Sequence, residues 1–500
     1  MCCFVGLFLV VAAHGNALKG GVMDKKVLSC DTVVIGAGTA GLEAYKAAVA
    51  SGAHCILVES GPLGTSAKRT GDTPVLALME AAKKCHALVD LERYGIKTNR
   101  EFSFDIDNVL NHVRAVRAKD TSDILSFIYQ IPELNRLIGK ARFVDEHSIV
   151  VNESIVVKFR SAVIATGSAP IVPYELSQYG VTGGVYTSNE FFDLDHLPAS
   201  MAIFGSNREG LLLGQALSYL GVKVVVFGNH RIWELTDDSV IDAAIHAYQQ
   251  RFELVLDSYT TAIEKYDHGF GIYYLDASNY ENVLSVDTIL ASSVRYPKLD
   301  GLNVRSLGLR LDRQGCISVN AQTMQTSISH IFAAGEVTSL GMTIARARHD
   351  GKLAGENAVL YPQPPRSVEP DFNINILLTD PELAQVGLSY DEVKMRAKSG
   401  SPFVSSEVRI SEGLYRICRN DGGTLRLYCD EATHLILGAE MCMYGASHIA
   451  HYLGLAIMQK LTIEQVAATT FFSPAYEEVV QKACAIAIKN LARRGQGLYN

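Results

Sequence analysis

The feature that most constrains the fold is a glycine-rich turn between an apolar strand and a helix near the start of the chain. Residues 31–50 read DTVVIGAGTAGLEAYKAAVA. In their G-x-G-x-x-G spacing, Gly36 permits the tight turn, Gly38 lets the backbone approach a pyrophosphate, and Gly41 lets the helix pack on the strand. A second apolar strand ends in Glu59, a carboxylate suited to a ribose hydroxyl pair. Because all these parts are in register, the segment predicts a dinucleotide-binding unit rather than a glycine-rich turn without function.

Chain length, charge and cysteine spacing limit the class of protein. At 500 residues the chain fits roughly three or four domains rather than one core. A net charge of −8 with no basic run argues against nucleic-acid binding. The 10 cysteines are scattered without a C-x-x-C or C-x4-C pair, which predicts neither a disulfide scaffold nor a metal site. They fit reduced thiols packed as small apolar residues, and the predicted location is the cytoplasm.

The first residues carry an apolar run, residues 4–13, that is too short to span a bilayer. A secretion signal usually begins with a positive region, but no Lys or Arg precedes this run. Residues 23–26, MDKK, resemble an ordinary cytosolic start just before the first strand. We expect residues 1–28 to form an N-terminal extension without structure; a secretion or anchoring signal is the alternative. No membrane span is predicted.

A second glycine-rich turn lies in the run MAIFGSNREGLLLGQA, which begins at residue 201. It keeps Gly205 and Gly210, but Asn207 stands at the middle position, where a side chain would occupy the space that a pyrophosphate needs. The strand after its helix ends in Gly228 rather than in an acid. Arg231, shortly afterwards, fits either a 2′-phosphate contact or a solvated surface charge. The turn predicts a second Rossmann-like unit with a degraded NAD(P) site.

Later motifs complete the domain organisation. An apolar strand closes in Ala-Thr-Gly at Thr166 and Gly167, which brings backbone close to a bound nucleotide. A late apolar strand ends in Gly335 and Glu336, and the proline-rich run 361–365 then leads to a final α+β domain. The predicted boundaries are 1–28 for the extension, 29–175 and 301–366 for the two parts of the first nucleotide-binding domain, 176–300 for the second, and 367–500 for the last domain.

This order of motifs resembles the pyridine nucleotide-disulfide oxidoreductases, and among them most the dihydrolipoamide dehydrogenases, over about residues 30 to 490. The resemblance implies an α/β fold with two Rossmann-like nucleotide-binding domains, for FAD and NAD(P), and a C-terminal α+β dimerisation domain. It also implies a homodimer in which electrons pass between a nicotinamide, FAD and a cysteine pair, with a histidine–glutamate pair of the partner subunit as acid and base. The positions that it assigns to FAD contacts are Gly36, Gly38, Gly41, Glu59, Gly64, Thr65, Arg69, Ala141, Thr166, Gly167, Gly335 and Glu336.

The redox pair of the family is missing on the same register. Its two cysteines fall on Ala67 and Asp72, and neither residue forms a thiolate. The loop lysine and the glutamate of the second glycine-turn helix, an ion pair in the family, fall on Leu76 and Leu212. Replacing both partners of a buried ion pair by leucine leaves no stranded charge, so these two changes compensate each other.

The acid-base group is missing as well. The catalytic histidine falls on Ser473, whose hydroxyl cannot serve as a near-neutral base, although Glu478 is retained. The second Ala-Thr-Gly reads Ala-Ser-Ser at residues 291–293, which further disfavours NAD(P). Glu336 replaces the aspartate that the family uses on the ribitol of FAD. Cys85, on the helix after the loop, is expected to be a packed thiol rather than a substitute.

Three functional hypotheses follow. The chain is a non-catalytic, FAD-binding homodimer that acts by binding a protein partner, or a thiol-independent flavin oxidoreductase, such as an NAD(P)H-dependent quinone or dye reductase. An active dihydrolipoamide dehydrogenase is the third hypothesis, and the missing groups argue against it. Whether the chain is an enzyme stays open at this stage, whereas disulfide reductase activity is expected to be absent.

Overall fold

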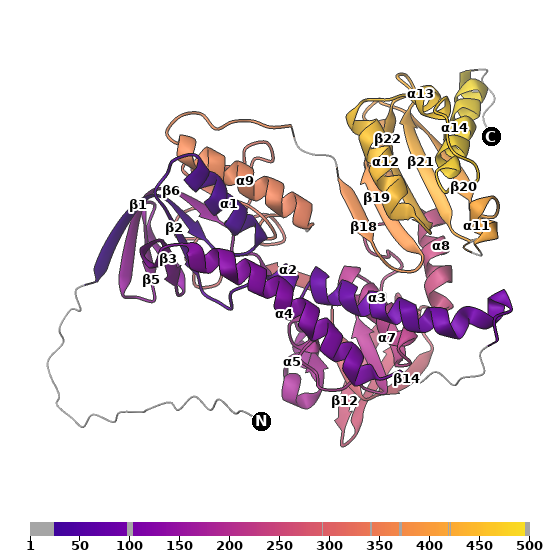
Figure 1. Ribbon diagram of the computed structural model, residues 1–500, viewed down its shortest axis with the longest axis horizontal. Helices are drawn as coiled ribbons and strands as arrows, with labels where there is room; N and C mark the ends of the chain where they lie inside the picture. Colours follow the sequence, from indigo (N-terminus) through magenta and orange to yellow (C-terminus); the bar gives the residue numbers. More distant parts are fainter. Residues whose placement is uncertain are drawn as a thin grey trace.

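The computed structural model of the chain describes residues 25–97, 104–292, 294–340, 343–369, 373–418, 420 and 422–495. These residues form three lobes, each built around its own large sheet (Figure 1). Most of the predicted N-terminal extension lies outside the described residues. The first strand nevertheless begins at Lys26, so residues 26–28, which the sequence assigned to the extension, belong to the first sheet.

The sheet of the first lobe contains seven strands: β1 (Lys26–Ile35), β2 (Cys55–Glu59), β3 (Arg136–Ile138), β4 (Ala141–Asp145), β5 (Ser148–Val151), β6 (Ile155–Ile164) and β17 (Ile331–Ala333). Their order is β3-β2-β1-β6-β5-β4, and β17 also pairs with β6. Pairing is parallel from β3 to β6 and onto β17, and antiparallel in the β4–β5–β6 branch. The parallel part has the pattern expected of a nucleotide-binding unit.

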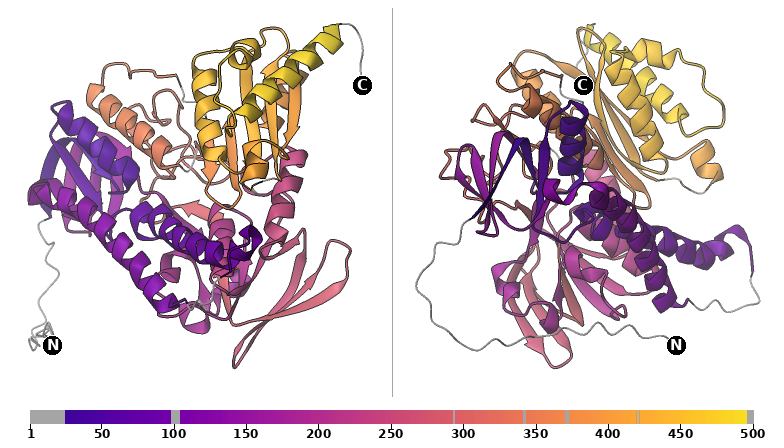
Figure 2. Two further views of the ribbon diagram at one scale, coloured as in Figure 1. Left: turned by 45° about the vertical axis from the view of Figure 1, so that its right-hand side comes forward. Right: turned by 60° about the vertical axis from the view of Figure 1, so that its left-hand side comes forward.

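Two helices, α1 (Thr39–Ala50) and α9 (Ile344–Leu360), pack side by side over this sheet (Figures 1 and 2). Their approach is close because α9 carries glycine at the crossing. A Cβ added at Gly355 would lie 2.3 Å from the carbonyl oxygen of Ala44. The crossing therefore holds the segment that follows the glycine-rich turn firmly against the sheet.

Further helices lead from the first lobe to the second: α2 (Ser66–Arg69), α3 (Asp72–Val89), η1 (Asp90–Tyr94), α4 (Ile106–Gln130) and η2 (Glu133–Asn135). Helix α3 packs on α4 and on α7 (Arg208–Tyr219), the helix of the second glycine-rich turn. Leu212 of α7 is buried in the core that these helices share, and Leu76 of α3 packs against the same core. The positions of the family's loop ion pair are therefore part of one apolar contact region.

The second lobe is a five-stranded parallel sheet in the order β11-β10-β9-β15-β8, joined to a three-stranded antiparallel sheet and a two-stranded ribbon. The strands of the parallel sheet are β8 (Val185–Tyr186), β9 (Ser200–Phe204), β10 (Lys223–Gly228), β11 (Glu253–Leu256) and β15 (Thr288–Ala291). The other strands are β12 (Tyr259–Tyr266), β13 (Gly269–Leu275), β14 (Glu281–Val286), β7 (Ser168–Ile171) and β16 (Val294–Pro297). The remaining helices are α5 (Tyr174–Ser177), η3 (Val181–Gly183), α6 (Ser188–Phe191) and α8 (Asp238–Gln249).

The third lobe is a five-stranded antiparallel sheet with helices on both faces (Figure 2). Its strands are β18 (Ile374–Leu377), β19 (Glu382–Gly387), β20 (Phe403–Arg409), β21 (Thr424–Asp430) and β22 (Ile436–Met443), in the order β18-β19-β22-β21-β20. Its helices are α10 (Tyr390–Lys398), α11 (Leu414–Ile417), α12 (Ala446–Met458), α13 (Ile463–Ala467) and α14 (Glu478–Gly495). Helix α8 of the second lobe also contacts this sheet.

The predicted fold class is confirmed: the chain combines two lobes with parallel sheets and one α+β lobe. Within the described ranges, none of the helices combines the length and the apolarity that crossing a bilayer requires.

Candidate functional site

The first glycine-rich turn is packed as the dinucleotide spacing requires. Gly36 has a φ of +107°, and a Cβ there would lie 2.2 Å from the carbonyl oxygen of Ala165. A Cβ at Gly41 would lie 1.8 Å from the carbonyl oxygen of Gly36, so only glycine fits between helix and strand. At Gly38 the nearest atom to an added Cβ is 3.9 Å away, which leaves the space above the turn open. The geometry therefore matches an N-terminal phosphate site on α1.

Glu59, at the end of β2, lies over this turn. Its carboxylate accepts hydrogen bonds from the backbone N–H of Ala37 (2.6 Å) and of Gly61 (2.9 Å). These bonds fix the orientation of the side chain, and a carboxylate with about four acceptor positions keeps capacity for ribose hydroxyls. The structure thus brings Glu59 to the turn, as the sequence predicted.

A buried hydroxyl without a partner marks the end of β6. Thr166 Oγ1 is buried and has no hydrogen-bond partner in the protein. Gly167 beside it has a φ of +68°, and its carbonyl oxygen accepts a hydrogen bond from the backbone N–H of Lys298 (2.9 Å). Buried polar groups are normally paired, so an orphaned hydroxyl next to the open space at Gly38 fits a polar ligand. On this observation, the residues around the turn fit the nucleotide part of FAD.

Lys298 is a residue of this region that the sequence analysis did not select. Burial lowers the pKa of its ammonium group, and the positive charge of Arg295 acts in the same direction. Glu59 and Glu336 oppose that effect, since both carboxylates lie close enough to interact with the ammonium group. A motif search could not have found Lys298, because it lies more than 250 residues from the turn in sequence.

The other positions assigned to FAD by resemblance are spread more widely. Gly64 has a φ of +105°, and Thr65 caps α2 by accepting a hydrogen bond from the N–H of Lys68 (3.4 Å). Ala141 lies in β4 and pairs with Val151 of β5. The proposed contacts of these residues with FAD stay predictions.

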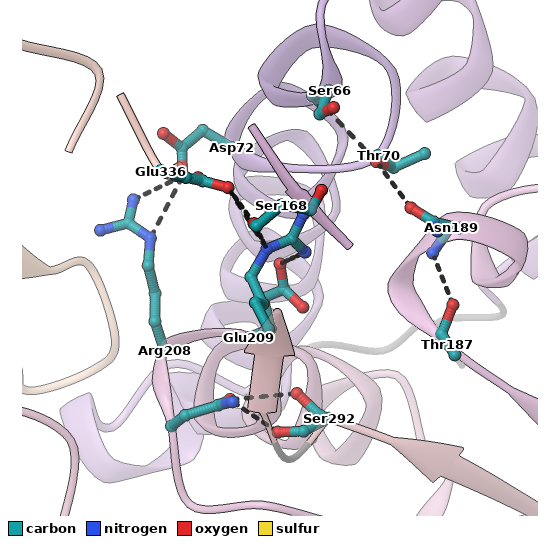
Figure 3. Close-up of polar contacts among 12 residues, drawn as sticks. Ser66, Thr70, Asp72, Ser168, Thr187, Asn189, Arg208, Glu209, Ser292 and Glu336 are labelled. Carbon is teal, nitrogen blue, oxygen red and sulfur yellow. Dashed lines mark hydrogen bonds and ion pairs between the residues drawn. The ribbon is translucent and has the colours of Figure 1, made fainter. Parts of the chain in front are cut away.

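Glu336, the acid after the late strand β17, interacts with residues of the second lobe. Glu336 accepts a short hydrogen bond from the hydroxyl of Ser168 and lies 3.5 Å from Nε of Arg295 (Figure 3). Gly335 before it has a φ of +81° and faces the Cβ of Ala40 in α1. Gly335 thus places this segment against helix α1, whereas the carboxylate of Glu336 belongs to a polar network with Ser168 and Arg295.

That network includes a second carboxylate that the sequence analysis missed. Glu209, in the first turn of α7, lies 3.3 Å from Nη1 of Arg295. Burial raises the pKa of Glu209, and the charge of Arg295 only partly offsets this effect. Arg295 also donates from Nε to the hydroxyl of Ser168 (2.9 Å). One guanidinium group therefore connects residues of both nucleotide-binding lobes.

The position of the second redox cysteine carries an ion pair. Asp72 begins α3, and its Oδ1 accepts hydrogen bonds from Nη2 (2.6 Å) and Nε (3.1 Å) of Arg208 (Figure 3). Arg208 is the first residue of α7 and also donates to the carbonyl oxygen of Ile376 in β18 (3.1 Å). The interaction joins all three lobes at this point. Ala67, at the first cysteine position, lies in α2.

The second glycine-rich turn keeps the Rossmann backbone, but the side chain of Asn207 forms hydrogen bonds within the turn and to Ser292. A Cβ at Gly210 would lie 2.0 Å from the carbonyl oxygen of Gly205, as in the first turn. Asn207 caps α7: its Oδ1 accepts from the N–H of Gly210 (3.0 Å) and from the hydroxyl of Ser292 (3.0 Å). Its amide nitrogen donates to the carbonyl oxygen of Ser292. The predicted contribution of Ser293 lies outside the described residues.

Two further predicted positions have simple environments. Arg231 forms an ion pair with Asp391 of α10, in agreement with the surface-charge interpretation. Glu478 begins α14 and accepts from the N–H of Ala475 (3.0 Å). That bond and a hydrogen bond from the hydroxyl of Ser473 lower the pKa of Glu478. The closing motif therefore holds a carboxylate–hydroxyl pair.

The described cysteines form no disulfide. All cysteines among the described residues are free, and Cys85 is buried in the core shared by α3 and α7. Burial raises the pKa of Cys85, which opposes thiolate formation. The described residues also contain no group of His, Cys, Asp and Glu side chains that could hold a metal ion.

Comparison with known proteins agrees with this architecture. Residues 30–351 match the family described as pyridine nucleotide-disulphide oxidoreductase, and residues 375–484 match the dimerisation domain of that family. The dihydrolipoyl dehydrogenase of Buchnera aphidicola subsp. Schizaphis graminum is 27% identical over 470 residues, which are 92% of this chain and 96% of the relative. The dihydrolipoyl dehydrogenase of Geobacillus stearothermophilus is 26% identical over 475 residues, which are 93% of this chain and 98% of that relative.

A solved structure shares the fold over nearly the whole chain. The HOCl-induced flavoprotein disulfide reductase RclA from Escherichia coli matches with a TM-score of 0.75 at 19% identity, over 91% of this chain and 99% of that chain. The two domain matches together span most of the sequence and follow the lobes described above. The chain therefore belongs to the pyridine nucleotide-disulphide oxidoreductases and is a dihydrolipoamide-dehydrogenase-like member of that flavoprotein family.

Proposed function

We propose that this chain is an FAD-binding homodimer without thiol-disulfide exchange, and that it acts by binding a protein partner rather than by oxidising dihydrolipoamide. The observation that carries this proposal is the ion pair between Asp72 and Arg208 at the dithiol position. A redox pair needs two cysteine sulfur atoms within bonding distance, whereas this position holds a carboxylate with its own counter-charge. Arg208 lies in the lobe that binds the nicotinamide in the family. The same contact therefore affects both the dithiol step and the nicotinamide step of the family's reaction.

Retention of FAD is supported by the first glycine-rich turn. The open space at Gly38, the oriented carboxylate of Glu59 and the unpartnered hydroxyl of Thr166 are the features that a dinucleotide would use. Lys298 adds a cation at the same place. When bound, FAD supplies a redox-active ring; in this proposal the protein uses it as part of the folded structure.

Loss of NAD(P) binding is supported by Asn207. Its side chain occupies the N–H of Gly210, one of the helix N-terminal donors that a pyrophosphate uses. The second hydrogen bond of the cap, from Ser292, joins the turn to the end of β15. A nicotinamide dinucleotide would have to displace a satisfied cap, which costs binding free energy.

Homodimer formation is supported by the third lobe, which matches the family's dimerisation domain. Leu455 and Met458 of α12 are exposed, as are Phe472 and Ile486. Exposed apolar side chains on such a domain are usual where a second subunit packs. The free cysteines of the described residues fit a reducing compartment, so we propose that the dimer works in the cytoplasm.

Anaerobic titration of the purified full-length chain tests the proposal. We expect about one FAD per subunit after denaturation, no bleaching by NADH or NADPH, and no turnover with dihydrolipoamide plus NAD. The dihydrolipoyl dehydrogenase of Geobacillus stearothermophilus serves as the positive control. A colourless chain that takes up no added FAD would refute the cofactor assignment. Rapid bleaching with electron transfer to a quinone or dye would instead favour the thiol-independent oxidoreductase.

A further inference from the structure

An open cleft lies between α2, α4 and α6, and the three functional hypotheses leave it without a role. It has a volume of about 540 Å³. This volume is within the range of small-molecule sites, roughly 300 to 1,000 Å³. Its lining includes Arg69, Thr70, Arg114, Arg117, Thr121 and Leu125.

The cleft carries an excess of positive charge. Three of its lining residues are arginines, and among all of them only Asp193 is acidic. Arg117 pairs with Asp193 at 2.6 Å, but the Asp193 side chain is 64% exposed and therefore well screened by water. Arg114 donates to neutral acceptors, the carbonyl oxygen of Leu194 and the side chain of Asn111. The guanidinium groups are thus only partly neutralised by the protein.

Two buried polar atoms in the cleft have no partner. Nε of Arg69 and Oγ1 of Thr121 are both buried, and neither forms a hydrogen bond within the protein. Burial lowers the pKa of Arg69, and the charges of Glu59 and Asp193 only partly offset this effect. Thr121 packs closely on Gly64, since its Cγ2 lies 2.5 Å from where a Cβ at Gly64 would stand. Buried donors of this kind are normally satisfied by a ligand or by ordered water.

The cleft adjoins the nucleotide turn at Arg69, which also interacts with the carboxylate of Glu59. Its lining contains none of Gly36, Gly38, Glu59 and Thr166, and it shares only Arg69 with the residues assigned to FAD by resemblance. Its lining includes the apolar side chains of Ala118 and Leu125 in α4. Thr70 and Asn189 also line it and are joined by a hydrogen bond of 3.4 Å (Figure 3). A ligand here would therefore meet both a cationic end and an apolar wall.

We propose that this cleft binds a small phosphate-bearing molecule, with its phosphate against Arg69, Arg117 and Thr121 and its remainder along Leu125. Guanidinium groups bind phosphate through two parallel N–H···O bonds, and a hydroxyl supplies a further donor. A phosphate would offset the excess charge and would lie beside both orphaned atoms.

Isothermal titration of the full-length chain with inorganic phosphate tests this site. We expect saturable binding that weakens about tenfold or more in Arg117→Gln and in Arg69→Gln, because each loses charge-assisted hydrogen bonds. Arg313→Gln is the matched control, since Arg313 is exposed elsewhere and the charge change is the same. Thermal unfolding without phosphate verifies that each variant is folded. If Arg117→Gln does not fold, Arg114→Gln, which removes another arginine of the lining, carries the test.

A second arm separates this cleft from the nucleotide turn. Gly38→Ala closes the space above the turn but is sterically tolerated, because Gly38 has a φ of −72°. We expect this variant to keep phosphate binding. Loss of binding in Gly38→Ala with retention in Arg117→Gln would overturn the proposal, as would equal losses in Arg313→Gln. Absence of binding at millimolar phosphate, or equal affinity for acetate, would also overturn it.

Discussion

At the scale of single residues, the clearest change is the pairing of Asp72 with Arg208. The two side chains are 29% and 35% exposed, so water screens their attraction. Exposed ion pairs contribute about 0 to 1 kcal/mol, while a guanidinium group that also binds a backbone carbonyl contributes more. The pair consequently organises the junction of the lobes more than it stabilises the fold.

The first prediction separates these contributions. Asp72→Asn should lower the free energy of unfolding by about 1 kcal/mol or less, because it removes only the ion pair. Arg208→Gln should cost about 1 to 2 kcal/mol, since the bond to the carbonyl oxygen of Ile376 is lost too. Urea unfolding measures both, with Arg231→Gln as the control for a more exposed pair. Equal costs for Asp72→Asn and Arg208→Gln would contradict the assigned role of the Ile376 bond.

The second prediction concerns the capped turn of α7. Asn207→Gly frees the N–H of Gly210 and opens the middle position, so affinity for NADH should rise. Glycine replaces asparagine at an N-cap at a cost of only a few tenths of a kcal/mol. Asn207→Ser is the control, because serine keeps a capping oxygen. Fluorescence titration with NADH gives the affinities; micromolar binding by the unmodified chain would contradict the blocking role of Asn207.

The third prediction follows from the raised pKa of Glu209. The folded protein binds a proton at this carboxyl more readily than the unfolded chain does, whose glutamate pKa is about 4.3. The resulting stability is present below that value and is lost as pH rises through the raised pKa. Glutamine does not titrate, so the Glu209→Gln variant does not lose this stability. Its free energy of unfolding should therefore rise relative to that of the unmodified chain as the pH increases from about 4.5 to about 7.5.

Denaturant unfolding across that pH range measures the difference. Glu133→Gln, an exposed carboxylate in η2, is the control and should show no such trend. Burial is the main cause of the raised pKa of Glu209, and four neighbouring groups modify it: Arg295, Ser188, Glu336 and Arg208. A constant difference between Glu209→Gln and the unmodified chain would show that the carboxyl titrates normally.

At the scale of helices and strands, the crossing of α1 and α9 couples the turn to the rest of the lobe. Gly355→Ala, the fourth prediction, would place a methyl group 2.3 Å from a backbone oxygen that cannot rotate away. The helices must separate, and overpacking of this kind costs about 1 to 3 kcal/mol. Because α1 follows the nucleotide turn, FAD should also be released more easily. Lys352→Ala, on an exposed part of α9, is the control, and chemical unfolding with released-flavin fluorescence gives both readouts.

The same scale shows what the sequence could predict. The spacing around Gly36 and Gly41 identified strand, turn and helix correctly, because close packing leaves only glycine at those positions. The start of β1 was misplaced, since Lys26 is in the strand through its partner Ile155, which lies 129 residues away. A strand edge set by a distant partner leaves no local pattern.

At the scale of the whole molecule, the polar contacts between lobes were the part that the sequence could not supply. Asp72 was selected as a lost cysteine position, but its partner Arg208 lies 136 residues along the chain. The effect of Asn207 on NAD(P) binding was predicted to be steric and stays a prediction, whereas the structure shows that its side chain caps α7. Charged residues are common in any sequence, so only the assembled fold identifies the pairs.

The whole electron path, rather than one residue, decides the last prediction. Restoring cysteines at Ala67 and Asp72 should not restore lipoamide turnover, because Ser473 cannot act as the base and Arg208 would lose its counter-charge. Adding Ser473→His, beside the retained Glu478, should raise the rate only slightly while Asn207 still caps the nicotinamide turn. Steady-state assays with lipoamide plus NADH measure each variant against the unmodified chain. Thiol-dependent turnover above roughly one per second, the low end for ordinary enzymes, in the unmodified chain or the double-cysteine variant would show that the chain reaches the acceptor by another route.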